Sequence, residues 1–447
     1  MGKVCYMLYT RRKNKKPKPN WGRILLTLLA VVVVGLSVYF LSAGLSRQSV
    51  GQNGSDQQQS ESPAVESPSA ETSPSLEPSA QPTPQSESPA PEQATPEVQL
   101  TGQRRMTLGA VGDIASGEFL LKAASTSDGY DYSEMFARMA PYLQMQDYTL
   151  ANLECVLAEE GEYSESVAPV QLADALKAVG FDVLGLANEH SLDLGVEGAM
   201  ATANLVEDAG LQSAGAYASG ADYLQPLILE GQDLRVAVLN YTASTLQTPD
   251  GAKDVVKYLD ETTLENDMNA VRAQEETVDF VVAMVHWGQE DVQEVTDEQK
   301  QWAKKLADAG VDVILGSHPH YLQPLEEIEA SDGSKTLVAY SLGNFLSAQR
   351  TQGRDMGAIL TFTLVKDYDA GTCYYENVSY QPSWVLRYSI EGKYHFEIMP
   401  VNEFEDKGYQ NMGTEARERI RQVAEEVRQA LGENVGKLDE TILEVAE

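Results

Sequence analysis

The chain has 447 residues, of which 43% are hydrophobic, and it carries 33 Lys and Arg against 67 Asp and Glu. The formal net charge of −34 argues against nucleic acid as a partner, and against any anionic polymer held by a broad basic surface, because like charges repel. A polyanionic substrate would therefore need a metal ion or a local basic cluster.

The first predicted element is a membrane-spanning helix at residues 24–45. This segment carries no charge, and about 22 apolar residues span the ~30 Å hydrocarbon layer as one helix. Residues 1–23 are rich in Lys and Arg, whereas only Arg47 lies close behind the segment, so the positive-inside rule places residues 1–23 in the cytoplasm as a basic tail. We expect a single-pass signal anchor in the cell membrane, with the rest of the chain extracytoplasmic. The alternative is a cleaved signal peptide, because small residues occur at 41–44.

A linker is predicted at residues 46–104. It consists mainly of Ser, Pro, Glu, Gln and Ala, and it has almost no aromatic or β-branched residues from which a core could form. We expect a disordered tether that sets the distance between the membrane and a folded domain.

The folded domain, predicted at residues 105–400, has an α/β pattern. Short apolar runs predict buried strands, and amphipathic stretches between them predict helices that cover the sheet. The predicted strands are 107–114, 148–154, 182–190, 235–242, 279–288, 312–320 and 336–345, and the predicted helices are 132–146, 172–179, 196–209 and 298–309. Aromatic-rich sequence at 371–401 predicts antiparallel strands that close the domain.

The C-terminal segment, residues 401–447, is predicted to be a helical tail. Residues 414–431 have Glu and Arg spaced for pairing along an exposed helix, so we expect a surface helix or interaction tail apart from the functional site.

The three cysteines, at positions 5, 155 and 373, contain no CxxC pair, which argues against a disulfide scaffold or a zinc knuckle. A bond between Cys155 and Cys373 stays open.

Four of the five histidines lie where predicted strands end, and two carboxylates end the first two strands. The six residues are Asp113, Glu154, His190, His286, His318 and His320. A single histidine in such a place is more often structural, but imidazoles and carboxylates together are the ligands that borderline divalent metals prefer. Because Pro319 separates His318 from His320, an extended chain would turn both rings to the same side. These residues predict a metal site.

Six short motifs occur in order along the folded region: GDI at 112–114, NLE at 152–154, ANEHSLDLG at 187–195, HWGQE at 286–290, GSHPHYLQP at 316–324 and YSLGNF at 340–345. Together they resemble the CapA family of poly-γ-glutamate capsule biosynthesis proteins, from residue 106 to the aromatic strands. The resemblance implies a fold related to the calcineurin-like metallophosphoesterases, a four-layer αββα sandwich of two sheets between helices.

The resemblance also implies a centre of two divalent metal ions, of Mn, Fe or Zn. Asp113 would belong to the first metal motif, and Glu154 would bridge the two ions. The later histidine motifs would supply His286, His318 and His320, and His190 would be the general acid beside the leaving group. Two such ions can activate a water molecule and stabilise an in-line displacement.

The chain departs from the family pattern at two positions. Ala115 stands where phosphoesterases have a histidine, which removes one ligand. Glu189 stands in the sequence Asn188-Glu189-His190 where the capsule family has Asn-Asn-His, so a charged carboxylate replaces a neutral metal ligand. Glu189 is therefore predicted to bind metal, and the number of ions stays open.

Six further motif residues are predicted to support the ligands or to contact substrate: Asn152, Asn188, Asp193, Trp287, Glu290 and Asn344. Asn152 and Asn344 would hold the ligand loops by hydrogen bonds to the backbone. Trp287 is favoured as a packing residue over a substrate contact. Asp193 and Glu290 are either partners of the ligands or caps of turns.

The first hypothesis for function is a membrane-anchored, extracytoplasmic protein with a metal-dependent hydrolase-like site. The resemblance implies a role in capsule or poly-γ-glutamate production, export or release, beside an envelope polymer and a membrane synthase complex. Two alternatives stay open: a non-catalytic assembly component of the synthase, and a surface phosphoesterase acting on an envelope phosphoester. Ala115 favours the assembly component, whereas His190 beside an intact His-Pro-His motif favours catalysis.

Overall fold

A computed structural model of the chain describes residues 100–402, 412–432 and 436–437, apart from residue 275. The predicted basic tail, the predicted membrane helix and nearly all of the predicted linker lie outside the described residues. Within the described ranges, no helix is both long and apolar enough to cross a membrane.

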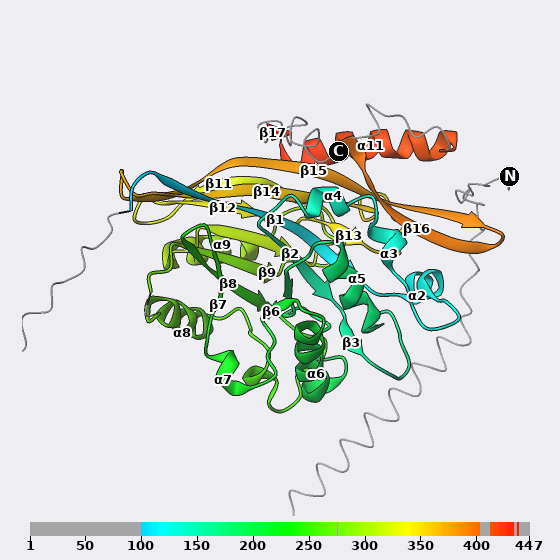
Figure 1. Ribbon diagram of the computed structural model, residues 1–447, viewed down its shortest axis with the longest axis horizontal. Helices are drawn as coiled ribbons and strands as arrows, with labels where there is room; N and C mark the ends of the chain where they lie inside the picture. The colour runs from blue at the N-terminus through cyan, green and yellow to red at the C-terminus, as the bar shows by residue number, and fades with distance from the viewer. Residues whose placement is uncertain (1–99, 275, 403–411, 433–435, 438–447) are drawn as a thin grey trace, which may run out of the picture. The chain divides into compact units, whose positions relative to one another are not determined.

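Two β-sheets form the centre of the domain (Figure 1). Seven strands of the nine-stranded sheet lie in the order β16 (Lys393–Pro400), β15 (Thr372–Ile390), β14 (Met356–Asp367), β1 (Gln103–Ala115), β2 (Tyr148–Glu154), β5 (Val183–Gly185) and β6 (Gln212–Ala214), while β13 (Asn344–Leu346) pairs with β1 and β17 (Gly436–Lys437) with β15. The six-stranded sheet has the order β11 (Leu325–Glu329), β12 (Lys335–Ala339), β10 (Val313–Ser317), β9 (Phe280–His286), β8 (Leu234–Thr242) and β7 (Leu227–Gly231). Two short strands, β3 (Val156–Ala158) and β4 (Val167–Pro169), pair with each other.

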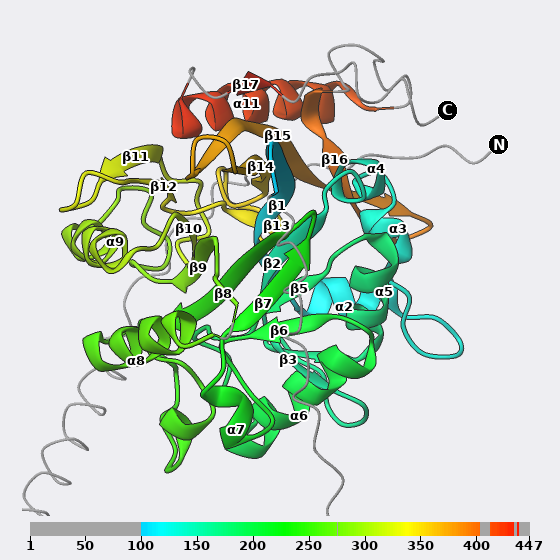
Figure 2. The same ribbon diagram turned by 60° about the vertical axis from the view of Figure 1, so that its left-hand side comes forward.

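The two sheets face each other across an apolar core, and helices cover their outer faces. Leu108 and Leu150 of the first sheet pack with Val238 and Val282 of the second. The first sheet is covered by α2 (Glu118–Ala124), α3 (Ser133–Phe136), α4 (Ala140–Leu143), α5 (Gln171–Val179) and α6 (Gly195–Asp208), and the second by α8 (Glu261–Arg272) and α9 (Asp297–Ala309). The short α7 (Gly220–Tyr223) and a 3₁₀ turn at Ala252–Asp254 lie in connections. Figure 2 shows α8 and α9 on one side of the strands and α2, α3 and α5 on the other. This is the α/β mixed-sheet fold that the sequence pattern predicts.

A close backbone contact sets the position of Asp113. The pairing register of β1 with β2 shifts between Ala110 and Asp113, and β13 pairs with β1 from Asp113 onward. A Cβ atom on Gly112 would lie 2.0 Å from the carbonyl oxygen of Gly343, so only glycine allows β13 to approach this closely. The Asp113 N–H then donates to that carbonyl at 2.9 Å.

The seven predicted strand runs all contain strands, and three of the four predicted helices appear as α5, α6 and α9. The prediction of one helix over 132–146 is wrong. Two four-residue helices, α3 and α4, occur instead, because Pro141 lies in the first turn of α4 and has no N–H with which to continue the helical hydrogen bonds of the preceding turn. The aromatic segment forms the antiparallel pair β15 and β16, as predicted.

The C-terminal helix α11 (Thr414–Leu431) is present at the predicted residues, and one of its faces packs on the domain. It lies along β15 (Figure 1) and buries an apolar stripe of Ala416, Ile420, Val423, Val427 and Leu431. The spacing of three and four residues places these side chains on one face, which the abundant charges on the other face obscured.

Cys155 is buried and Cys373 is exposed, and neither forms a disulfide in the described part of the chain.

Candidate metal centre

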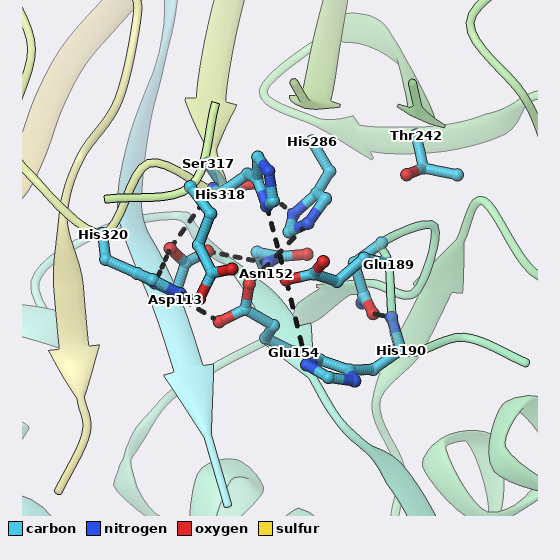
Figure 3. A network of polar contacts seen from close by, with 12 residues as sticks. Asp113, Asn152, Glu154, Glu189, His190, Thr242, His286, Ser317, His318 and His320 are labelled. Carbon is cyan, nitrogen blue, oxygen red and sulfur yellow. Dashed lines mark hydrogen bonds and ion pairs between the residues drawn. The ribbon is translucent and has the colours of Figure 1, made fainter. Parts of the chain in front are cut away.

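The six predicted ligand residues lie together where strands of both sheets end (Figure 3). The neighbours β1, β2 and β5 are parallel, as are β8, β9 and β10, so each set brings its carboxyl ends to one edge. Asp113 lies near the end of β1, Glu154 ends β2, Glu189 follows β5, His286 ends β9, and His318 and His320 follow β10.

Three of these residues form a first group, which we call position A: Asp113, Glu154 and His320. All three are buried, and their ligand atoms lie within 4.8 Å of one another. His320 Nδ1 is 3.3 Å from Asp113 Oδ2 and 3.6 Å from Glu154 Oε2. Two carboxylates and an imidazole at this spacing are a suitable ligand set for Mn, Fe or Zn.

Four residues form a second group, position B: Glu154, Glu189, His286 and His318. His286 Nε2 is 3.7 Å from Glu154 Oε1, and His318 Nδ1 is 3.5 Å from Glu189 Oε1. Glu154 belongs to both groups, with Oε1 toward His286 and Oε2 toward His320. Its carboxylate therefore has the orientation that bridging two cations requires.

The chemistry of the buried atoms fits a bound cation. Within the described part of the chain, Glu154 Oε1, His286 Nε2, His318 Nδ1 and Asn152 Oδ1 are buried without a hydrogen-bond partner. Leaving one such atom unpaired costs about 1–3 kcal/mol, and native proteins contain few of them. Three of the four belong to residues of position B, so a divalent ion there would supply their missing partner.

The pKa shifts at His286 and Glu189, both of position B, suit metal binding. Burial lowers the pKa of His286 well below 6.5, and the neighbouring His318 lowers it further, so this ring is neutral and can ligate. Burial and the charge of Asp113 raise the pKa of Glu154 well above 4.5, which records how unfavourable two carboxylates are here without a cation. Burial acts to raise the pKa of Glu189, but His318 and His190 outweigh it and lower that pKa.

The geometry of the His-Pro-His segment differs from the prediction. His318 and His320 have φ angles of 96° and 60°, so the segment is not extended, yet both rings reach the centre, with their centroids 6.4 Å apart. His318 belongs to position B, whereas His320 belongs to position A and also to a third group, with Glu189 and Glu290. Left-handed backbone at two non-glycine residues costs of order 1–3 kcal/mol each, and such strain concentrates at functional sites. The His318 N–H donates to Asp113 Oδ2 at 3.3 Å, which helps to hold the turn.

His190 lies beside position B and is oriented by its neighbours. Its Nδ1 is 2.9 Å from Asp193 Oδ2, and its Nε2 is 3.9 Å from Glu189 Oε1. The His190 N–H donates to Asn188 Oδ1 at 3.1 Å, and the Asn188 amide donates to the Leu153 carbonyl at 2.7 Å. Asp193 thus orients the ring, and Asn188 ties the loop to β2.

Two asparagines support ligands by side-chain contacts. Asn152 Nδ2 donates to Asp113 Oδ1 at 2.8 Å, and Asn344 Oδ1 lies 3.1 Å from His320 Nδ1. The expected hydrogen bond to the backbone is made by Asn344, whose Nδ2 donates to the Arg354 carbonyl. The Asn152 amide donates to a side chain, that of Asp113, instead.

Trp287 and Glu290 differ in their access to the site. The Trp287 side chain is 2% exposed, packs under the second sheet and donates from its indole N–H to the Tyr340 carbonyl at 2.9 Å, so it does not reach a substrate. Glu290 is half-exposed, with Oε1 3.8 Å from His320 Nε2, at the mouth of the site.

Two functional side chains were not predicted from the sequence. Ser317 Oγ lies 3.3 Å from His286 Nδ1 and orients that ring, and its place immediately before His318 was the available signal. Asn240 accepts the Ala187 N–H at 2.7 Å and donates to the Met284 carbonyl at 3.2 Å, which joins the two sheets beneath the Glu189 loop. No motif points to Asn240, because its role depends on contact between the sheets.

A cavity of about 320 Å³ opens over the ligands, and we call it the central hollow. It is lined by Ala115, Ser116, Phe119, Glu154, Glu165, Glu189, His190, Glu290, His320, Ser347, Ala348 and Gln349. Four of these residues are glutamates, and no Lys or Arg of the described chain is among them. His190 therefore faces the same space as the ligands, and the lining itself does not attract anions.

These motifs and this geometry agree with the sequence comparison. The family described as "Bacterial capsule synthesis protein PGA_cap" matches residues 107–349. The chain belongs to this capsule synthesis family. It is 30% identical over 256 residues to "Capsule biosynthesis protein CapA" of Bacillus anthracis. The aligned region covers 55% of this chain and 60% of that protein. This chain is also 29% identical over 281 residues to "PGA biosynthesis protein CapA" of Bacillus subtilis strain 168. That alignment covers 61% of this chain and 71% of the relative.

Among solved structures, a novel phosphatase from Mycoplasma pneumoniae superposes with a TM-score of 0.38 at 12% identity, covering 63% of this capsule-family chain and 94% of that one. The calcineurin-like phosphoesterase YfkN of Bacillus subtilis superposes with a TM-score of 0.33 at 13% identity, covering 73% and 97%. At such TM-scores the function rests on the geometry of the site itself.

Proposed function

We propose that this chain is a membrane-anchored, extracytoplasmic capsule synthesis protein whose central hollow is a metal-dependent hydrolase site of the phosphoesterase type. Its process would be the production, export or release of poly-γ-glutamate or a similar envelope polymer, beside a membrane synthase complex. One observation carries the catalytic part: Glu154 is shared by two ligand groups, and three buried atoms of position B lack partners.

Position A would hold one divalent ion through Asp113, Glu154 and His320, and position B a second through Glu154, Glu189, His286 and His318. When bound, two such ions supply a nucleophile at neutral pH and charge stabilisation for an in-line displacement. Position A has three ligand residues and position B has four, and Ala115 contributes only a methyl group to the hollow. We infer that position A is the weaker of the two.

The protein's own contribution to chemistry would come mainly from His190. Asp193 accepts a hydrogen bond from Nδ1, so a second proton, held on Nε2 beside Glu189 when the ring is protonated, is the one that His190 would donate. A proton donor in this place would protonate the leaving group of a substrate in the hollow. The glutamates of the lining repel polyanions, so an anionic polymer would be held by the cations of the centre.

A non-catalytic assembly role is the second candidate. Ala115 favours this role, because it lines the central hollow and its methyl side chain cannot bind a metal ion. In that case the cation would stabilise the strand ends, and His190 would have no catalytic effect.

The test is to purify the full chain in detergent, determine bound metals by mass spectrometry, and assay γ-glutamyl and phosphodiester substrates. The variants are His318→Ala and, as a matched control, His395→Ala, since His395 lies on β16 and stacks on Tyr388 outside the centre. We expect about two metals and hydrolysis of one substrate class, both reduced in His318→Ala and unchanged in His395→Ala. Metal without hydrolysis of either class supports the assembly role, and absence of metal after loading rejects the metal centre.

A further inference from the structure

The hairpin of β15 and β16 lies outside the residues that match the capsule family, and one of its faces carries aromatic and cationic side chains. Arg387 pairs in register with Phe396, and Ser389 with Tyr394. Side chains alternate between the two faces of a strand, and cross-strand partners share a face. The side chains of Arg387, Tyr394 and Phe396 therefore lie on one face of the hairpin. Two contacts join this face to the central hollow.

The first contact runs through Phe119 of α2, a helix that packs against β16 (Figure 1). Phe119 lines the central hollow, and its ring meets that of Tyr394 edge to face, with the centroids 5.8 Å apart. The guanidinium carbon of Arg387 in turn lies 4.9 Å from the centroid of the Tyr394 ring. Phe119 and Tyr394 are each 41% exposed, so both rings keep a free surface. Two aromatic rings thus connect the hollow to a cation.

The second contact runs through Arg350. Its guanidinium donates to the carbonyls of Ser347 and Ala348, which both line the central hollow, at 2.5 Å and 3.1 Å. It also donates to the carbonyl of Val385 on β15 at 2.6 Å, and its Cζ atom lies 5.3 Å from the centroid of the Phe396 ring. Arg350 therefore joins the wall of the hollow to the same face of the hairpin.

Neither arginine has an acidic partner. Among the described residues, no hydrogen bond or ion pair joins Arg387 or Arg350 to a carboxylate, whereas Arg138 beside the hairpin pairs with Glu397 at 2.6 Å. Burial lowers the pKa of Arg350 to about 10; Asp355 opposes this shift, and the charge of Arg387 adds to it. Two like charges that act on each other in this way favour an anion beside them. Arg387 has the free donors for such an anion, because carbonyl groups already accept from Arg350.

The chemistry of poly-γ-glutamate suits these side chains. Each unit of that polymer carries a carboxylate next to a short run of methylene groups. An arginine fork binds a carboxylate at two points, and the exposed rings of Phe119 and Tyr394 offer apolar surface to the methylene groups. The lining of the central hollow has four glutamates and no Lys or Arg of the described chain, so it offers no cation of its own to the polymer. In a chain of net charge −34, the hairpin face supplies the local basic cluster that a polyanion needs.

We propose that Phe119, Arg387 and Tyr394 form a binding ledge for the part of an anionic polymer that lies outside the central hollow. Arg387 holds a carboxylate of the polymer, and the two rings pack on its methylene groups. This inference rests on the proposed function, because that function supplies the polymer. It assigns recognition of the polymer to the hairpin and leaves the reacting bond to the metal centre, so the ledge binds without metal.

The test measures binding of a fluorescently labelled γ-linked decaglutamate to the full chain in detergent, by fluorescence anisotropy with excess chelator. Arg387→Met removes the guanidinium. Its matched control is Lys300→Met, because Lys300 is an exposed cation on α9, which covers the other sheet. Tyr394→Ala removes one ring of the ledge, and its control is Tyr374→Ala, at a side chain that is 37% exposed near the other end of β15.

We expect Arg387→Met to weaken binding by about 10-fold, which is the usual effect of losing a hydrogen-bonded charge. Tyr394→Ala should weaken it by about 2–5-fold, the effect expected for an exposed cation–π contact. Neither control should change the affinity. A γ-linked decamer whose carboxylates are amidated should bind the wild type and Arg387→Met equally.

An equal loss in Arg387→Met and Lys300→Met would overturn the proposal, because it would show a general effect of net charge. Binding of the decaglutamate that requires metal, or no binding at all, would overturn it as well. Failure of the metal centre is a separate result, since these measurements are made without metal, and metal-dependent hydrolysis without binding at the ledge would reject the ledge alone. Should Arg387→Met not fold, Arg387→Lys, which keeps the charge but not the two-point contact, is judged by the same measures.

Discussion

Replacing Glu154 by Gln should change stability in opposite directions with and without metal. Burial and the charge of Asp113 raise the pKa of Glu154 above its unfolded value of 4.5. The folded state then holds this proton more tightly than the unfolded state, so the stability of the metal-free protein falls as pH rises above that value. Gln cannot ionise and lacks this loss. At pH 7 the metal-free variant should therefore unfold at a higher temperature than the metal-free wild type.

With metal the order should reverse, because Glu154 belongs to both ligand groups. A ligand at 100 times its dissociation constant stabilises the folded state by about 2.7 kcal/mol. A domain of roughly 330 residues unfolds with an entropy of about 0.7 kcal/mol/K, so the melting temperature of the wild type should rise by about 4 °C. In the variant the rise should be about 1 °C or less.

Differential scanning calorimetry at pH 7, with excess chelator or with Mn²⁺ or Zn²⁺, measures both effects. The reasoning is refuted if the wild type gains no thermal stability from any divalent metal, or if Glu154→Gln gains as much as the wild type. A metal-free variant that melts below the metal-free wild type would refute the account of the buried carboxylates.

Three further predictions concern other parts of the chain. Asp193→Asn should lower kcat about 100-fold on whichever substrate class the assay above detects while leaving metal content unchanged, because a neutral amide can turn its NH₂ group toward His190 Nδ1 and no longer stabilises the protonated ring. Burial raises the pKa of Asp312 to about 6, so the free energy of unfolding of the wild type should fall as pH rises from about 4 to 6. Measured by urea unfolding, Asp312→Asn should be up to about 3 kcal/mol more stable than the wild type at pH 7 and equally stable below pH 4. Ile420→Ala on α11 should cost about 2–5 kcal/mol in urea unfolding, since its side chain is fully buried.

Each of these predictions has an outcome that would contradict it. A parallel loss of metal in Asp193→Asn would assign Asp193 to the ligand shell instead. For Asp312, a difference from wild type that persists at pH 3 would mean that packing, not ionisation, is responsible. Ile390→Ala, at a side chain that is 40% exposed, is the comparison for Ile420→Ala, and equal costs at both positions would contradict the burial of α11.

The local pattern predicted most of the elements, because buried strands and amphipathic helices have distinct periods that neighbouring residues alone express. It failed where a single residue or a distant surface decided the outcome. Pro141 divides the helix predicted over 132–146. The apolar stripe of α11 has its partner on β15, which the charged sequence of the helix does not reveal.

For the site, the sequence by itself determined which residue types stand at the strand ends: the carboxylates Asp113 and Glu154 and the histidines of the later motifs. The tertiary structure alone decided how they are divided between two positions, because that depends on the left-handed turns at His318 and His320 and on the meeting of two sheets. It likewise decided the contacts of Asn344 with His320 and with the Arg354 carbonyl. Strand periodicity is a property of a few adjacent residues, whereas these contacts join segments that only the completed fold brings together.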